Sequence, residues 1–279
     1  MNLAEWTVQI DDAFFLIGAA ILLIEIAEMI FKGDLKAKTF LEMVASASTQ
    51  IPYILVETFI LTGAYALYWI IAQEMPWSIP VTWWSVILVI LLADLTYYWE
   101  HRIAHEVRLL WTQHAVHHSS RDMNIVTAVR FGPLEGIWSL IAHLPLAFMG
   151  FAPEAIILGI ISVLAYQTWL HTELIGKLGP LEWFMNTPSH HRVHHGCDDK
   201  YLDKNYGGIL IIWDRLWNTF QLEEETPRYG LKRDFDSQNP IKVWFSEWPQ
   251  LFRDIFASRS VGEAFGYLFR RPGWKPPSR

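Results

Sequence analysis

Three long apolar runs, each interrupted by no more than two acidic residues, dominate the first hundred positions. They cover Phe14–Phe31, Ile51–Ala72 and Pro80–Tyr98. A helix of about 20 apolar residues is long enough to cross about 30 Å of hydrocarbon. The pattern therefore predicts about three transmembrane helices before residue 99.

Two further apolar runs, Leu134–Met149 and Pro153–Leu170, are separated only by residues 150–152. So short a connection predicts a helical hairpin. Because its first arm is short for a full crossing, the hairpin either dips into the bilayer or spans it.

From His171 onward the chain is more polar. Ile241–Ala257 carries Trp, Leu, Phe and Ile at helical intervals, opposite charged residues. This predicts an amphipathic helix that lies either on the membrane surface or against the C-terminal region itself. The last ten residues, 270–279, are predicted to form a disordered basic tail.

Together these segments predict one all-α integral membrane domain over residues 1–279. Its parts are transmembrane helices (1–98), a first histidine-rich region (99–133), the membrane hairpin (134–170), and a second histidine-rich region with a cytoplasmic helical cap (171–279). We find no linker that would separate two domains.

Composition supports a membrane protein, since 52% of the 279 residues are hydrophobic and 18% are charged, whereas soluble proteins have about 25% charged residues. The net charge of −7 argues against nucleic-acid binding, which requires a basic surface. One cysteine, Cys197, excludes an intramolecular disulfide. The acidic N-terminus lacks the basic start of a cleavable signal peptide.

The basic residues predict an orientation. All 22 Lys and Arg lie on one side of the predicted spans, and segments 1–13, 73–79 and 150–152 on the other side contain none. Since Lys and Arg favour the cytoplasmic side, we expect the N-terminus outside and every histidine motif at the cytoplasmic face.

Nine of the eleven histidines are concentrated in two stretches, 94–118 and 187–196. Eight of the nine form one HX3H and two HX2HH motifs, and the ninth is His190. On a helix, residues three or four apart share a face. The eight imidazoles at these spacings exceed the four ligands of a tetrahedral zinc ion, which predicts two metal ions. His171, at the cytoplasmic end of the hairpin, is a ninth candidate. The predicted ligands are His101, His105, His114, His117, His118, His171, His191, His194 and His195.

Other polar residues near these motifs are candidates for a supporting role. Asp94 shares a helical face with the HX3H motif, so we expect it either to accept a hydrogen bond from a ligand imidazole or to join two helices. Glu106 either acts similarly or is solvated. His190 points about 100° away from the next histidine and is predicted to support the site, whereas His143 is predicted to lie outside it.

The segments HRIAHEVRLLWTQHAVHHSS, QTWLHTELIGKLGPLEWFMNTPSHHRVHHG and DKNYGGILIIWDRLWNTF resemble the fatty acid hydroxylase and sterol desaturase superfamily. The likeness covers roughly residues 85–225 and is greatest to the ether-lipid-cleaving, tetrahydrobiopterin-dependent branch. Some relatives have a histidine four residues before the one that matches His171. Gln167 at that position implies one ligand fewer at one metal.

The resemblance implies a lipid monooxygenase with two Fe²⁺ ions, which activate oxygen, and with tetrahydrobiopterin as a further cofactor. Its implied partners are a membrane lipid, molecular oxygen and an electron donor, and no protein nucleophile is needed beyond the metal ligands. The O-alkyl chain of alkylglycerols is the implied substrate. A fatty acyl or sterol hydroxylase or desaturase has the same motifs.

Imidazole spacing alone does not select iron, because imidazole also suits Zn, Cu and Ni. A membrane metal transporter is the alternative from another class. It would place ligands near the midplane on discontinuous helices open to both faces.

Overall fold

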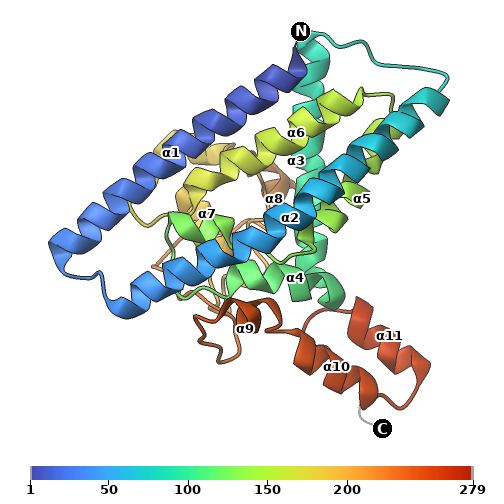
Figure 1. Cartoon of the computed structure of the whole chain (residues 1–279). Coiled ribbons are helices and arrows are strands. Elements are labelled where there is room, and N and C mark those ends of the chain that lie inside the picture. The colour runs from blue at the N-terminus through green and yellow to red at the C-terminus, as the bar shows by residue number, and fades with distance from the viewer. Residues whose placement is uncertain (1, 278–279) are drawn as a thin grey trace.

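The computed structural model describes residues 2–277, and within them the chain is all-α, as the sequence predicts (Figure 1). The helices are α1 Leu3–Lys32, α2 Ala37–Glu74, α3 Trp83–Glu106, α4 Arg108–His118, α5 Glu135–Phe148, α6 Pro153–Gln167, α7 Pro188–His194, α8 Ile212–Leu216, α9 Pro240–Trp244, α10 Trp248–Phe256 and α11 Val261–Phe269. Short 3-10 turns η1 Ile125–Val129, η2 Thr168–Leu170 and η3 Gly179–Trp183 lie between them.

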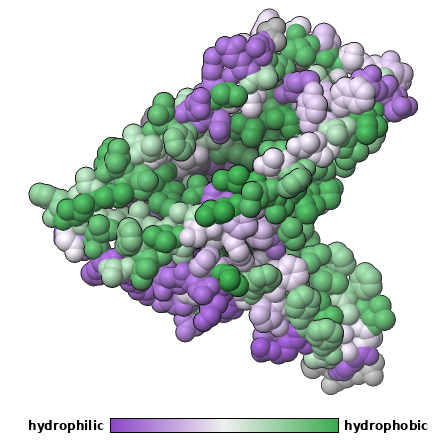
Figure 2. All heavy atoms as spheres, viewed as in Figure 1, coloured by the Kyte–Doolittle hydropathy of each residue, from purple (hydrophilic) through white to green (hydrophobic). Residues whose placement is uncertain are grey.

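Three helical segments in the described part are long and apolar enough to cross a membrane: α1, α2, and α6 continued through η2. Figure 2 shows hydrophobic side chains over much of the outer surface of the body, and Phe15 and Phe59 are 71% and 80% exposed. Such exposed apolar surface fits contact with lipid. α1 and α2 match the first two predicted spans, while α6 with η2 is the second arm of the predicted hairpin.

The third predicted span, Pro80–Tyr98, forms most of α3, whose last turns carry charged residues and the HX3H motif. Thr82 and Ser85 start this helix with a reciprocal capping box. α3 packs closely on α6, where a side chain at Gly159 would lie 3.0 Å from the Ala93 Cβ. This packing fixes the helix that carries His101 and His105.

α5 and α6 form the predicted hairpin, and Gly150 between them has a positive φ of 90°. α5 has 14 residues and is therefore about 21 Å long, which is short of the hydrocarbon thickness. α6 has 15 residues and reaches 18 only when it is continued through η2, so the second arm is longer than the first by four residues.

The first histidine-rich stretch is not one continuous helix. α3 ends at Glu106, Val107 is extended (φ −111°, ψ 113°), and α4 starts at Arg108. The HX3H motif and the first HX2HH motif consequently lie on two separate helices that meet at this bend.

α10 and α11 form a hairpin that projects from the body (Figure 1). The prediction of a disordered tail is wrong for residues 270–277, which contact this hairpin and α3. Arg271 pairs with Glu106 of α3 at 2.7 Å, and the Trp274 ring packs against Tyr267 of α11. These ion-pair and ring contacts hold the segment in place, although its Pro and Gly residues suggest a flexible chain. Residues 278 and 279 lie outside the described residues.

The outer face of this hairpin is apolar, with large exposed side chains on both helices. They are Phe252, Phe256, Val261, Phe265 and Phe269. The inner face buries Leu251 and Asp254. We therefore expect the outer face of the hairpin to contact lipids at the surface of the membrane that the long apolar helices of this chain cross.

A fluorophore on Phe256→Cys, in a Cys197→Ser background, should be quenched by spin-labelled lipid in nanodiscs. The control position is Gln250→Cys, because Gln250 lines a cavity and is not among the exposed apolar side chains. We expect strong quenching at 256 and weak quenching at 250. Equal quenching at the two positions would show that the hairpin does not lie in the bilayer surface.

Candidate metal centre

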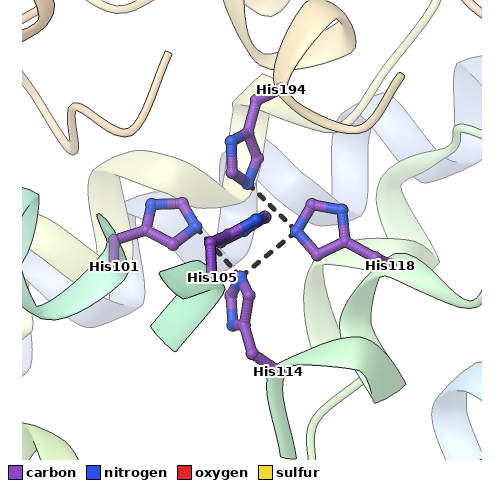
Figure 3. Close-up of side chains that lie close together, drawn as sticks. All are labelled: His101, His105, His114, His118 and His194. Atoms are coloured by element: carbon purple, nitrogen blue, oxygen red, sulfur yellow. Dashed lines mark hydrogen bonds between the residues drawn. The ribbon is translucent and has the colours of Figure 1, made fainter. Parts of the chain in front are cut away.

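All nine predicted ligand histidines are buried and lie in two groups. We call them cluster 1 and cluster 2. Within each group, one ring nitrogen from every histidine lies within 4.8 Å of the others. Cluster 1 (Figure 3) is His101, His105, His114, His118 and His194, and cluster 2 is His117, His171, His191 and His195.

Each HX2HH motif contributes to both clusters. On α4, His114 and His118 point into cluster 1 while His117 belongs to cluster 2. Neighbouring residues on a helix diverge by about 100°, so the paired histidines of the second motif, His194 and His195, also separate. The motifs therefore hold two centres side by side, instead of presenting all three histidines on one shared face.

The rings in both clusters turn Nε2 inward and Nδ1 outward. In four of the nine rings Nδ1 contacts a backbone carbonyl, which can only accept, so Nδ1 carries the proton in those rings. The outward contacts are His101 to the Tyr206 carbonyl (2.9 Å), His194 to the Lys204 carbonyl (3.0 Å), His117 to the Arg130 carbonyl (3.2 Å), His171 to the Gln167 carbonyl (3.0 Å), and His114 to the Glu135 carboxylate (2.5 Å).

Inside each cluster, lone pairs face lone pairs. The Nε2 atoms of His101 and His114 are 3.0 Å apart, and those of His117 and His171 are 3.1 Å apart. With Nδ1 protonated in all four rings, neither member of a pair has a proton to share. A cation between them would accept both lone pairs, and the donor set of each cluster fits a metal ion.

Burial also keeps these rings neutral. Desolvation lowers the pKa of His171 to about 4 and that of His194 to about 3, against an ordinary value near 6.5. Protonation at neutral pH would therefore not relieve the facing lone pairs, and Nε2 stays available as a ligand.

Asp94 does not bind a ligand imidazole. Its carboxylate accepts hydrogen bonds from the backbone N–H groups of Ile209 (2.6 Å) and Leu210 (3.1 Å) and from Trp213 Nε1 (2.8 Å). These three donors engage both carboxylate oxygens. Of the two roles expected for Asp94, the hydrogen bond to a histidine is therefore absent among the described residues, whereas the contact with Trp213 joins α3 to α8.

The loop after α7 supplies acceptors for cluster 1. The Asp214 carboxylate accepts from the backbone N–H groups of Tyr206 and Gly207, both at 2.7 Å. A Cβ at Gly208 would lie 2.7 Å from the Asp94 carboxylate, so this close approach requires glycine. Two buried carboxylates thereby position the carbonyl that holds His101.

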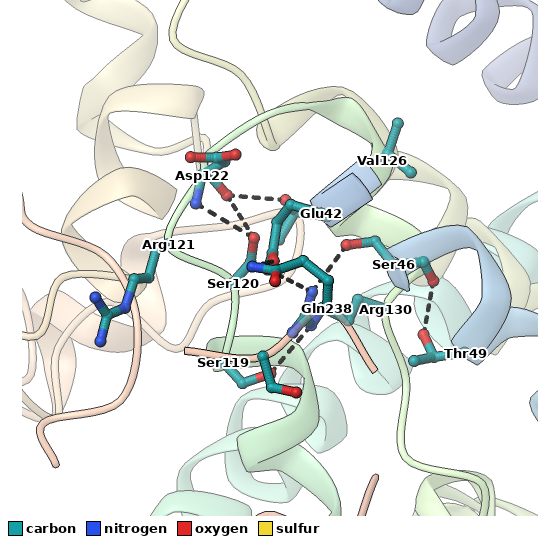
Figure 4. Close-up of polar contacts among 12 residues, drawn as sticks. Glu42, Ser46, Thr49, Ser119, Ser120, Arg121, Asp122, Val126, Arg130 and Gln238 are labelled. Atoms are coloured by element: carbon teal, nitrogen blue, oxygen red, sulfur yellow. Dashed lines mark hydrogen bonds and ion pairs between the residues drawn. The ribbon is translucent and has the colours of Figure 1, made fainter. Parts of the chain in front are cut away.

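Arg130 supports cluster 2 through a buried network (Figure 4). Its guanidinium donates to Ser119 at the end of α4 (3.0 Å) and to Glu42 (2.8 Å) and Ser46 (3.0 Å) of α2. The carbonyl of the same residue accepts from His117 Nδ1. The network therefore ties α2 to the acceptor that orients this ring.

The remaining predicted supporting residues lie away from the imidazoles. Glu106 pairs with Arg102 and Arg271. The buried His190 ring packs edge-on to Phe220, and no hydrogen bond joins it to a cluster histidine among residues 2–277. His143 lies outside both clusters, as predicted.

Sequence reasoning missed Glu135, which contacts His114 from the start of α5. An acidic residue opening an apolar helix reads equally well as a favourable charge at the helix N-terminus. Only the packing of α4 on α5 places it beside a ligand.

A cavity of about 550 Å³ adjoins both clusters. Its lining includes His105, His118 and His194 of cluster 1 and His195 of cluster 2, together with side chains of α10 and the segment after α11. This volume is typical of a site for a small molecule or a lipid headgroup.

Comparison with known proteins identifies a family. Residues 86–219 match the model of the fatty acid hydroxylase family. The alkylglycerol monooxygenases of Xenopus tropicalis and Homo sapiens are each 43% identical to this chain over 203 residues, which is 73% of the chain and 45% of each relative. The chain thus spans under half the length of these relatives.

A bacterial protein, the ornithine lipid hydroxylase of Rhizobium tropici, is 35% identical over 138 residues, covering 49% of the chain and 41% of the relative. Relatives of this chain thus include a bacterial lipid hydroxylase as well as animal monooxygenases. No solved structure matches the chain.

Replacing a cluster histidine should remove one metal and leave the other. We expect His194→Ala to lower the metal content of the purified protein from about two ions per chain to about one, because it takes one ligand from cluster 1. His117→Ala should do the same for cluster 2, and His143→Ala is the matched control. Wild-type metal content in both cluster variants would contradict the assignment.

Glu135→Gln should weaken cluster 1 without removing a ligand. A neutral amide is a poorer acceptor for His114 Nδ1–H, and losing such a partner lowers metal affinity by about 10- to 100-fold. Chelator titration of the metal-loaded variant would measure this. Unchanged affinity would mean that Glu135 does not tune the site.

Proposed function

We propose a substrate and a reaction from one premise: through residues 86–219 this chain belongs to the fatty acid hydroxylase family, whose members are membrane-bound oxygenases with histidine clusters. The proposal is that the protein is a di-iron monooxygenase that hydroxylates a C–H bond of a membrane lipid. Its substrate in this proposal is the O-alkyl chain of an alkylglycerol ether lipid.

The observation that carries the proposal is the pair of buried, all-imidazole clusters with inward Nε2 atoms. The nine histidines would hold two iron ions, five ligands at one and four at the other. When bound, the iron ions would supply the redox chemistry that inserts one atom of O₂ into the C–H bond and reduces the other to water with two electrons from a donor.

The residues of the chain hold and shield this site. The carbonyls of Tyr206 and Lys204 and the Glu135 carboxylate keep the Nδ1 protons in place, so that the rings keep one orientation. Burial of all nine rings reduces their contact with bulk water, which limits side reactions at the site. No protein nucleophile is required.

The ether substrate is suggested by the relatives named alkylglycerol monooxygenase. Hydroxylation of the carbon next to an ether oxygen gives a hemiacetal, which collapses to an aldehyde and an alcohol. Tetrahydrobiopterin is the proposed electron donor, and the cavity beside both clusters is large enough to admit such a molecule.

The proposed location is an integral membrane protein with the clusters at the cytoplasmic face. Three helices long enough to cross and the one-sided distribution of Lys and Arg support it. A metal transporter is disfavoured, because all nine cluster histidines are buried, whereas a transporter would need ligands that open to both faces.

Lipid mass spectrometry tests this function directly. Membranes with the protein, iron, oxygen and an alkylglycerol should release a fatty aldehyde, and release should depend on tetrahydrobiopterin. The His194→Ala protein serves as the inactive control. A lipid that gains one oxygen or loses two hydrogens with another reductant would identify a hydroxylase or desaturase instead, and absence of any oxygen-dependent turnover would contradict the proposal.

A further inference from the structure

Helix α1 buries one acidic side chain, Glu25, although the helix is long and apolar enough to cross a membrane. Of its 30 residues, α1 buries Leu3, Gly18 and Glu25, and Glu25 is 4% exposed. An acid buried in such a helix is costly and is a candidate for a function. Glu25 does not belong to either histidine cluster, so its role must lie in its other contacts.

The buried residues of α1 include a close contact with η2, the turn that precedes His171. Gly18 and Glu25 are about two turns apart and therefore share a face of the helix. A Cβ at Gly18 would lie 2.9 Å from the Thr168 side chain of η2, so glycine allows the helix to approach the turn closely. The same face brings Glu25 to the residues that follow η2.

Both oxygens of the Glu25 carboxylate accept hydrogen bonds from segments that support cluster 2. The Thr172 hydroxyl donates to Oε1 at 2.5 Å, and the backbone N–H of Ile125 donates to Oε2 at 2.9 Å. Thr172 is 0% exposed and Ile125 is 6% exposed. Neither buried donor can turn to bulk water instead, so both depend on this carboxylate.

His171 is the ligand that most needs such an anchor. The other eight ligands lie in α3, α4 or α7, or directly follow α7 as His195 does. His171 instead follows the 3-10 turn η2, with φ −88° and ψ 68°, so its backbone is not part of a helix. The next residue, Thr172, is held by Glu25 through its hydroxyl and by Arg192 through its carbonyl (2.9 Å).

The second contact of Glu25 leads towards another ligand of the same cluster. Ile125 is the first residue of η1, and the residue after η1 is Arg130, whose carbonyl accepts from His117 Nδ1. His117 and His171 are neighbours in cluster 2, with Nε2 atoms 3.1 Å apart. One carboxylate on α1 therefore holds two segments that meet at cluster 2.

We propose that Glu25 is a positioning residue for cluster 2, which acts through Thr172 and Ile125 to hold His171 and His117 at the distance that one metal ion requires. Contacts that fix a ligand histidine from outside the metal shell control metal affinity. This rests on the proposed function only through its metal ions, and it requires neither a particular lipid nor turnover. The helix α1 is thereby coupled to one metal of the pair.

Metal affinity measured at one cluster at a time tests the proposal. In a His194→Ala background cluster 2 keeps all its ligands, and in a His117→Ala background cluster 1 does. Each purified protein would be loaded with Co²⁺ and titrated with a chelator, following the visible absorption of bound cobalt, which also reports the geometry of its ligands. The titration contains no lipid, oxygen or reductant.

Glu25→Ala removes both acceptor oxygens and should weaken cobalt binding at cluster 2 about tenfold, while the affinity of cluster 1 stays unchanged. Glu25→Gln keeps one acceptor oxygen, so its loss should be smaller. The matched control is Glu28→Gln on the same helix, whose side chain is 36% exposed and pairs with Lys32. It should leave both affinities unchanged.

A double-mutant cycle tests the route through Thr172. Thr172→Val keeps the shape of the side chain without its hydroxyl and should also weaken cluster 2, whereas Thr172→Ser should keep the wild-type affinity. Glu25 and Thr172 share one hydrogen bond. Glu25→Gln combined with Thr172→Val should therefore weaken cobalt binding by less than the product of the two single effects.

Unchanged cluster 2 affinity in both Glu25 variants would overturn the proposal. An equal loss at both clusters would also overturn it, because it would indicate a general loss of structure, and the cluster 1 titration detects this in each variant. Effects that multiply in the double variant would contradict the route through Thr172. Selective loss at cluster 2 in a protein whose wild type releases no aldehyde would support the proposal and contradict only the proposed function.

Discussion

The structure depends on one constraint: imidazole rings that present bare Nε2 lone pairs to one another at about 3 Å. This arrangement favours cations inside the clusters, because outward hydrogen bonds hold the protons of five rings on Nδ1 and burial opposes further protonation. Much of the remaining architecture near the site serves to hold these rings. Asp94 and Asp214 fix the loop that bears the Tyr206 carbonyl, and Arg130 fixes the carbonyl that meets His117.

The bilayer helices determine where this centre can lie. α3 starts among apolar neighbours and ends with His101 and His105, and α6 leads through η2 to His171. Both helices therefore start in the apolar body of the protein and end at the histidine clusters. Between the clusters and solvent lies the cavity, with the α10–α11 hairpin as one wall. A lipid oxygenase needs such a boundary, because its substrate comes from the membrane and its electron donor reaches the site from the aqueous side.

The nine histidines singled out in the sequence, because clustered imidazoles at spacings of three and four are typical of metal sites, are the nine that the structure brings together in the two clusters. The sequence also predicted the helical class and the hairpin from apolar run lengths. It did not predict the division into two clusters, since spacing places His114, His117 and His118 on one broad face, and only the opposing histidines decide which ring turns to which metal. The bend at Val107 was also missed, because neither Gly nor Pro marks it.

The supporting residues were harder to predict for a physical reason. Glu135 and Arg130 reach the ligands from other elements, and contacts between elements leave no periodic trace in a sequence. Asp94 was recognised as unusual because a carboxylate in an apolar helix needs partners. Its partners proved to be backbone amides more than a hundred residues away.

X-ray absorption spectroscopy on the iron-loaded protein tests the central claim most directly. We predict a coordination shell dominated by nitrogen, with the outer-shell scattering of imidazole and between four and five histidines per iron on average, as the two clusters require. A shell dominated by oxygen or sulfur, or one with only one or two imidazoles per iron, would contradict the account.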